Sequence, residues 1–244
     1  MINIKGLDEK TKMKAHLLLT HGAGASCQSH FMQQLAAALR LENIKVTLFD
    51  FAYMRERLVA NSKRPPPKAA LLVSELAQAL SDIEANLPLF VGGKSMGGRV
   101  ASLFAALQDR QEARATKPDT IQSAVPDDEQ NSLQSQAQSR INAKVQAIFA
   151  YGYPFHPPKK AVWRTDHFSV LKLPLFIMQG ERDPFGTRFE LHDMAWPNVS
   201  LNWLPAADHD FKPLKRSGLT QAILIQQAAI LTSRYIDAVI TKSE

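Results

Sequence analysis

The sequence predicts a single α/β domain in which a mostly parallel sheet carries helices on both faces. Short apolar runs of strand length alternate with longer segments that have helical periodicity, which is typical of parallel sheets. The chain has 244 residues, 45% of them hydrophobic, and can therefore build one core that buries roughly 70 to 75% of the unfolded surface. No internal repeat divides the chain, so we treat residues 1–244 as one domain.

The N-terminal part predicts three strands separated by two helices. Residues 16–20 form a short apolar run, and residues 31–39 place apolar side chains on one face of a helix. Residues 44–51 and 71–83 repeat this alternation of strand and helix. Residues 87–91 form a third apolar run, and the helical pattern resumes after it. Each strand is thus followed by a helix that can return the chain to the same edge of the sheet.

The C-terminal part predicts three further strands and a closing helix. Residues 145–151, 175–178 and 201–204 are apolar runs, and residues 219–240 have a helical apolar face. The stretch 109–144 interrupts the alternation, because it is rich in Gln, Ser, Asp, Glu and Arg. We expect a polar surface insertion there, partly disordered or weakly helical, since so few apolar residues cannot offset the entropy of ordering. A lid over the active site is the functional alternative.

Charge and cysteine usage restrict the class of protein. The formal net charge of +6 permits contact with nucleic acid, but the basic residues are scattered and no recognition-helix signature is present. The single cysteine, Cys27, excludes an intrachain disulfide and fits a reducing compartment. The first ten residues lack the apolar core of a signal peptide, and no later run is expected to span a bilayer. We therefore expect a soluble cytoplasmic protein without nucleic-acid or membrane partners.

A G-x-S-x-G motif places Ser95 between a predicted strand and a predicted helix. At such a sharp turn the backbone doubles back, so small residues are needed two positions before and after the serine. Gly93 and Gly97 meet this requirement. The pattern alone is also compatible with an ordinary glycine turn, so a role for Ser95 as nucleophile depends on other residues.

A serine nucleophile needs a base that takes its proton and an acid that orients the base. Asp183 follows the predicted strand at 175–178, and His209 follows the last predicted strand at 201–204. The chain order Ser95, Asp183, His209 is that of the α/β-hydrolase fold. These three residues are therefore the predicted catalytic triad.

Two further acids lie close to this pair in sequence. Glu181 and Asp210 are alternatives to Asp183, which we prefer because it lies deeper in its loop and precedes the turn-forming Pro184. A metal site at 208–210 is disfavoured, because adjacent side chains diverge and no second His/Cys cluster supplies more ligands. We expect no metal.

Small residues follow the first predicted strand, where an oxyanion hole is expected. Residues 21–25 read His-Gly-Ala-Gly-Ala, an HG-type loop whose backbone N–H groups can turn inward. The oxyanion donors would be the amide of Ala23 or Gly24 together with the amide of Met96. The loop matches neither the dinucleotide nor the Walker A phosphate pattern, and we expect no cofactor.

Ligands of parallel sheets bind at the carboxyl ends of the strands, so three loops are expected to wall the pocket. These loops are residues 53–67, 153–166 and 209–216. The segment between Tyr153 and Leu171 is too short for a multi-helix lid, so we expect open access. The candidate substrate-binding residues are Tyr53, Met54, Arg64, Tyr153, His156 and Lys212.

Several segments together resemble a known family. They include Gly-Gly-Lys-Ser-Met-Gly-Gly-Arg at 92–99, Tyr-Gly-Tyr-Pro-Phe-His-Pro-Pro at 151–158, Arg-Asp-Pro-Phe-Gly at 182–186 and Asp-His-Asp-Phe-Lys-Pro at 208–213. With them the chain resembles the testis-expressed-protein type of small α/β-hydrolase, related to dienelactone hydrolases, over nearly its whole length. The resemblance implies an α/β-hydrolase fold and a Ser, Asp, His triad. Eukaryotic members of that family include a chromatin-complex subunit.

Together these residues predict a serine hydrolase that acts on a small carboxylic ester or thioester. His209 would deprotonate Ser95, and Asp183 would hold the imidazole tautomer. The alternative from another class is a non-catalytic scaffold or complex subunit with the same fold, since fold does not determine function. The presence of all three triad residues in order argues against a scaffold.

Overall fold

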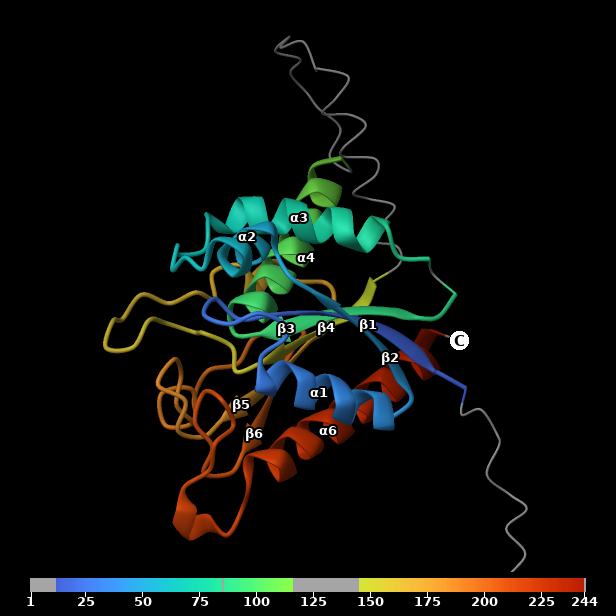
Figure 1. Cartoon of the computed structure of the whole chain (residues 1–244). Helices are drawn as coiled ribbons and strands as arrows, with labels where there is room; N and C mark the ends of the chain where they lie inside the picture. The colour runs from blue at the N-terminus through green and yellow to red at the C-terminus, as the bar shows by residue number, and fades with distance from the viewer. Residues whose placement is uncertain (1–11, 85, 116–144, 244) are drawn as a thin grey trace, which may run out of the picture.

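A sheet of six parallel strands lies at the centre of the fold (Figure 1), and the predicted fold class is confirmed. The computed structural model describes residues 12–84, 86–115 and 145–243. The strand order across the sheet is β2-β1-β3-β4-β5-β6. In chain order the strands are β1 (Ala15–Thr20), β2 (Ile44–Phe49), β3 (Leu89–Lys94), β4 (Val145–Tyr151), β5 (Leu175–Gly180) and β6 (Val199–Leu204).

Helices cover both faces of the sheet. In Figure 1, α1 and α6 lie on one face, whereas α2, α3 and α4 lie on the other. Two short 3₁₀ helices, η1 and η2, occur in the loops of the C-terminal part. The bounds are α1 (His30–Leu41), α2 (Ala52–Ala60), α3 (Ala69–Ser81), α4 (Met96–Ala115), η1 (Phe168–Val170), η2 (Lys215–Ser217) and α6 (Gln221–Ser243).

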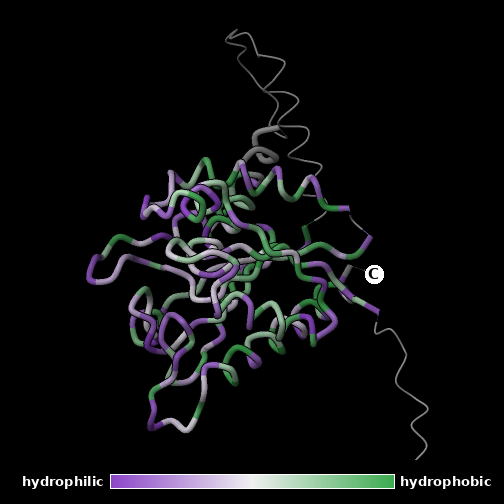
Figure 2. Tube along the Cα trace, viewed as in Figure 1, coloured by the Kyte–Doolittle hydropathy of each residue, from purple (hydrophilic) through white to green (hydrophobic). Residues whose placement is uncertain are grey.

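The four inner strands are buried along almost their whole length because helices cover both faces of the sheet, whereas the edge strands β2 and β6 are partly exposed. Successive side chains of a strand point to opposite faces, so Leu17 packs in the core under α1 and α6 while Leu18 packs in the core under α3 and α4. Phe90 and Val91 on the neighbouring strand alternate in the same register. Figure 2 shows hydrophobic green along the central strands and hydrophilic purple on the outer loops. Polar chemistry is therefore concentrated where the strands end.

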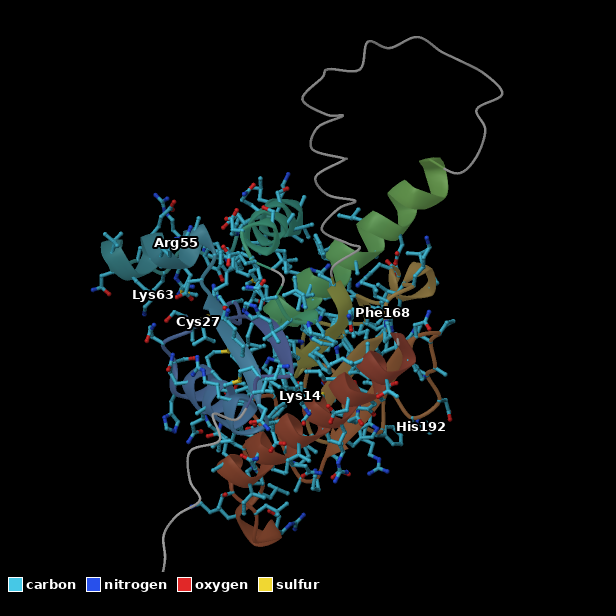
Figure 3. The ribbon with its side chains drawn as sticks, turned by 90° about the vertical axis from the view of Figure 1, so that its right-hand side faces the viewer. Lys14, Cys27, Arg55, Lys63, Phe168 and His192 are labelled. Carbon is cyan, nitrogen blue, oxygen red and sulfur yellow. The ribbon has the colours of Figure 1, made fainter. Side chains whose placement is uncertain are left out.

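Helix α6 closes the fold against the sheet. The segment Gln221–Lys242 is long and apolar enough to cross a membrane by length and composition, so the expectation that no run has this length is wrong. In the fold, its residues Leu224, Ala228 and Ile236 are fully buried in the core shared with α1. Lys14, just before β1, lies beside α6 and its ammonium contacts Asp237 at 2.7 Å (Figure 3). The apolar face of α6 thus belongs to the core of the domain.

Helix α2 occupies part of the segment that was expected to be a pocket loop, residues 53–67. Of its nine residues, Tyr53 and Met54 are buried, which leaves too few apolar positions for helical periodicity to be recognised in the sequence. The helix ends at Ala60, and the next residue, Asn61, has a left-handed φ of 46° that turns the chain out of the helix. The predicted loop is therefore corrected to a helix followed by a shorter loop.

Helix α4 extends to Ala115, beyond the expected start of the polar insertion at residue 109. Asp109 is buried, and its Oδ2 accepts a hydrogen bond from the Lys172 amide at 2.8 Å. The first part of the stretch 109–144 thus belongs to the helix, and residues 116–144 lie outside the described residues. Because α4 has 20 residues and rises about 1.5 Å per residue, Ala115 lies about 30 Å from the end that follows Ser95.

Candidate active site

Ser95 forms the turn between β3 and α4 with a φ of 50°, a left-handed value that is uncommon for residues other than glycine. A Cβ on Gly93 would lie 2.6 Å from the Gly97 carbonyl carbon, and a Cβ on Gly97 would lie 2.8 Å from the His21 carbonyl oxygen. Both distances are too short for real side-chain contacts. Glycine on each side therefore allows the strained turn that presents Ser95.

Backbone hydrogen bonds hold Ser95 in the wall of a cleft. The Ser95 amide donates to the Tyr151 carbonyl at 3.0 Å, and the Ser95 carbonyl accepts from the Arg99 amide at 3.1 Å. The cleft has a volume of about 480 Å³. Ser95 and His209 both line it, together with the 22–25 loop, Phe31 and Lys94.

Asp183 and His209 are in direct contact. His209 Nδ1 lies 2.7 Å from Asp183 Oδ2, with the carboxylate fully buried and the His209 side chain 19% exposed. The Phe185 amide donates to Asp183 Oδ1 at 2.9 Å, and the Phe185 ring packs on the imidazole with centroids 4.4 Å apart. Because Nδ1 donates its proton to the carboxylate, Nε2 is the nitrogen that can accept a proton.

Gln179, which the sequence analysis missed, orients the same carboxylate. It is fully buried at the end of β5, and its Nε2 donates to Asp183 Oδ2 at 2.9 Å. Its Oε1 accepts from the Tyr153 amide at 2.7 Å, which fixes the direction of the side-chain amide. A polar residue one position before the end of a buried strand, close to an acidic loop, is the sequence signal that could have identified it.

The two alternative acids have other partners. Glu181 Oε2 accepts from the Ala206 amide at 2.9 Å and Oε1 accepts from Arg188 at 2.6 Å. The Ala206 amide, followed by Arg188, lowers the pKa of Glu181. Asp210 faces the Lys94 ammonium at 3.4 Å. Among the three carboxylates considered, Asp183 is the one that accepts from the His209 ring.

The side chain of Asp208 closes a turn in the loop around His209. Asp208 Oδ1 accepts hydrogen bonds from the amides of Asp210 and Lys212, both at 2.9 Å. Such a turn, in which an aspartate side chain binds backbone amides that follow it, folds the chain tightly. Within the described part of the chain, no group of three or more His, Cys, Asp or Glu side chains could hold a metal ion.

His21 fixes the start of the expected oxyanion loop. It is fully buried, its Nδ1 donates to the Gly22 carbonyl at 2.6 Å, and its Nε2 accepts from the Phe51 amide at 3.2 Å. One donor and one acceptor correspond to a neutral imidazole. Burial lowers the pKa of His21 and so keeps the ring neutral. The ring therefore connects the loop after β1 to the segment after β2.

Two side chains from α2 hold the next peptide group of this loop. The Ala23 carbonyl accepts from Tyr53 Oη at 3.2 Å and from Arg57 Nη1 at 3.1 Å. Burial raises the pKa of Tyr53 to about 12, so its hydroxyl remains a donor at neutral pH. Tyr53 Oη also lies 3.7 Å from the sulfur of Met96, the residue after Ser95. Tyr53 thus contacts both segments from which oxyanion donors are expected.

The expected substrate-binding residues separate into those in the cleft and those outside it. Lys212 lines the cleft with Ser95. Tyr53 lies behind the oxyanion loop, and Met54 is buried in the core next to α3 and α4. Arg64 lines a second cavity of about 440 Å³, together with Arg57.

The two candidates from the 153–166 loop are held inside the fold. Tyr153 is fully buried, and its hydroxyl donates to the Arg164 carbonyl at 2.9 Å. His156 is 6% exposed and packs against Trp163 with ring centroids 5.1 Å apart. Neither residue belongs to the lining of the cleft that contains Ser95.

A second serine and histidine pair lies in the interior. Ser102 Oγ and His167 Nε2 are 2.8 Å apart, and Ser102 Oγ also donates to the Arg99 carbonyl at 2.8 Å. Ser102 is 0% exposed and His167 is 7% exposed. A substrate would have to open the core between α4 and η1 to reach this pair, so we assign it a structural role.

With this geometry established, sequence comparison identifies the family. The profile of a family described as an alpha/beta hydrolase domain matches residues 13–126 and 128–237, so the chain belongs to that family. No curated protein was found to match the chain by sequence.

Solved structures share the fold at low sequence identity. A dienelactone hydrolase from Anabaena variabilis has a TM-score of 0.60 and 20% identity, covering 94% of this chain and 88% of its own. An α/β serine hydrolase without a lid from Xanthomonas campestris has a TM-score of 0.55 and 16% identity, covering 93% and 84%. An esterase from Pyrococcus furiosus has a TM-score of 0.57 and 16% identity, covering 94% and 83%. These likenesses establish the fold, and the family match places the chain among the alpha/beta hydrolases.

Proposed function

We propose that the protein is a serine hydrolase that cleaves a small carboxylic ester or thioester. The observation that carries the proposal is the 2.7 Å contact between His209 Nδ1 and buried Asp183 in a cleft that also contains Ser95. The strained φ of 50° at Ser95 adds support, because strain of this kind is characteristic of a nucleophile presented at a strand-to-helix turn.

In the proposed reaction, His209 Nε2 takes the proton of Ser95 Oγ as this oxygen attacks the substrate carbonyl carbon. Asp183 holds the Nδ1–H tautomer and stabilises the imidazolium that forms. The amides of Ala23 or Gly24 and of Met96 donate to the tetrahedral oxyanion. The intermediate collapses as His209 protonates the leaving alcohol or thiol. Water, deprotonated by His209, then attacks the acyl carbon, and His209 returns the proton to Ser95 Oγ as the bond between Oγ and the acyl carbon breaks and the acid leaves.

The size of the cleft is consistent with a small-molecule substrate. Its volume of about 480 Å³ is within the range of roughly 300 to 1,000 Å³ that small-molecule sites occupy.

We assign the protein to the testis-expressed-protein type of small α/β-hydrolase on its sequence motifs, and we place it in the cytoplasm. The cleft is lined by residues 22–25 and, from the other expected loop, by His209, Asp210 and Lys212, and the mechanism needs neither metal nor cofactor.

The test is a hydrolysis screen of purified protein against short and medium acyl esters and the matching thioesters. We expect turnover of at least one series, and a loss on the order of 10⁴-fold or more in Ser95→Ala. Ser102→Ala is the matched control, because this serine also contacts a histidine. Its kcat should stay within about threefold of wild type, since a buried serine outside the cleft makes no contact with substrate.

Two results would count against the proposal. If no ester or thioester is turned over, the non-catalytic scaffold becomes the better description. If Ser102→Ala abolishes turnover while its melting temperature is unchanged, the nucleophile has been misassigned.

A further inference from the structure

Lys94, the residue directly before Ser95, has its ammonium inside the fold. It is 6% exposed, although lysine is almost never fully buried without a partner. Its Nζ donates to the His209 carbonyl at 2.8 Å and lies 3.4 Å from Asp210 Oδ1. The same ammonium is 5.3 Å from the centroid of the Phe31 ring. The side chain thus bridges the nucleophile turn and the loop that carries the histidine.

A buried ammonium is costly, so its presence requires an explanation. Burial lowers the pKa of Lys94, and Asp210 and then Asp183 oppose that effect. The turn at Ser95 does not itself demand lysine, because its steric restrictions fall on Gly93 and Gly97. A neutral or apolar side chain at position 94 would avoid the desolvation cost.

The space around the contact is tightly filled. Gly152, at the end of β4, has a φ of 69°, and a Cβ there would lie 2.9 Å from the His209 carbonyl oxygen and 3.3 Å from Lys94 Nζ. Glycine at position 152 therefore allows the lysine and the histidine main chain to meet. The ring of His209 is held by Asp183 and Phe185, but neither of those contacts fixes its carbonyl.

We propose that Lys94 is a positioning residue for His209. Its hydrogen bond to the His209 carbonyl fixes the main chain that carries the imidazole and ties it to the residue preceding Ser95. Lys94 is joined to Ser95 by a peptide bond and to His209 by this hydrogen bond. These two links together determine the distance between the nucleophile and the base. This inference rests on the proposed function, because positioning matters only if Ser95 and His209 react.

The decisive variant is Lys94→Met, which keeps the length of the side chain and removes its donor. With a neutral ester as substrate, we expect kcat to fall by about 10- to 100-fold while KM changes by less than about twofold, because misplacement by 1 Å can cost this much in rate. The matched control is Lys215→Met, which removes an exposed cation further along the same segment. Its kcat should remain within about twofold of wild type.

Asp210→Asn separates the hydrogen bond from the ion pair. It removes the counter-charge of Lys94 but leaves the donation to the His209 carbonyl, so its kcat should fall much less than that of Lys94→Met. An equal loss in the two variants would overturn the proposal, since the ion pair would then carry the effect. A rise in KM with unchanged kcat would also overturn it and make Lys94 a substrate contact.

A spectroscopic readout tests the positioning without turnover. The proton that His209 Nδ1 shares with Asp183 should give a downfield ¹H NMR signal, assigned by its loss in His209→Ala. We expect this signal to broaden in Lys94→Met through exchange with solvent and to persist in Lys215→Met. An unchanged signal and kcat in Lys94→Met, with an active wild type, would refute the role of Lys94 but leave the proposed function intact. An inactive wild type would refute both.

Discussion

His209 Nδ1 lies 2.7 Å from Asp183 Oδ2, although the two residues belong to loops that follow different strands, β6 and β5. These strands are neighbours in the sheet, so their carboxyl ends bring the loops together. The carboxylate also accepts from Gln179 Nε2 and from the Phe185 amide, both at 2.9 Å. Three donors therefore hold one buried carboxylate in the orientation that the imidazole needs.

Asp183→Asn should reduce kcat by about 10⁴-fold, because an amide that replaces the carboxylate favours the wrong imidazole tautomer. KM should change little, since Asp183 is buried away from the substrate. Steady-state kinetics on an ester measure both parameters.

Glu181→Gln is the matched control for that prediction. Glu181 is bound to Arg188 and to the Ala206 amide rather than to His209, so a loss of less than about threefold is expected. The reverse ranking of the two variants would transfer the role of the acid to Glu181.

Tyr53 and Arg57 should act together on the oxyanion hole, because both donate to the Ala23 carbonyl. Either donor can hold the peptide group in the absence of the other. We therefore expect Tyr53→Phe and Arg57→Met each to lower kcat by less than about tenfold, and the double variant to lose more than the product of the single losses.

A double-mutant cycle in kcat, with KM recorded in parallel, checks this coupling. Arg55→Met is the control, since Arg55 lies on the same helix and contacts the Asp50 carbonyl instead. If the loss of kcat in the double variant equals the product of the two single losses, the two donors act independently on the Ala23 carbonyl and the prediction is wrong.

Stability should decrease as the pH falls below about 6.5, in part because of His21. Burial places the pKa of His21 in the folded protein below its ordinary value of 6.5. Between these two values the unfolded chain binds a proton that the folded chain does not, so the free energy of unfolding falls with decreasing pH. One such group contributes a slope of at most about 1.4 kcal/mol per pH unit.

Urea unfolding at several pH values between about 7.5 and 5 measures this slope. His21→Asn should be less stable at neutral pH but should show a shallower decrease. If wild type and variant lose stability with the same slope, His21 is not a source of the pH dependence.

Much of the fold could be predicted because it depends on periodic patterns. Six apolar runs predicted the six strands. Ser95, Asp183 and His209 were selected as candidates because each of them follows the end of one of these strands. Helix α2 could not be predicted, because it buries only Tyr53 and Met54 and has little helical periodicity. Its position depends on packing against residues distant in sequence.

The details of the site were harder to predict than its location. Tyr153 and His156 occur in a polar and aromatic loop at the correct edge of the sheet, yet both are buried and neither lines the cleft. The sequence analysis assigned no role to Lys94 or Gln179, because their contacts with His209 and Asp183 are visible only in the folded chain. Sequence patterns indicate which edge of the sheet is reactive, whereas the direction of each side chain there is decided by tertiary contacts.

The central claim, that Ser95 is an activated nucleophile, is tested most directly by a fluorophosphonate probe. Intact-protein and peptide mass spectrometry should find one adduct, located on Ser95 and missing from Ser95→Ala, with much slower labelling in His209→Ala. Ser102→Ala should label at the wild-type rate. The absence of an adduct on the folded wild-type protein, or an adduct on Ser102 in place of Ser95, would contradict the account.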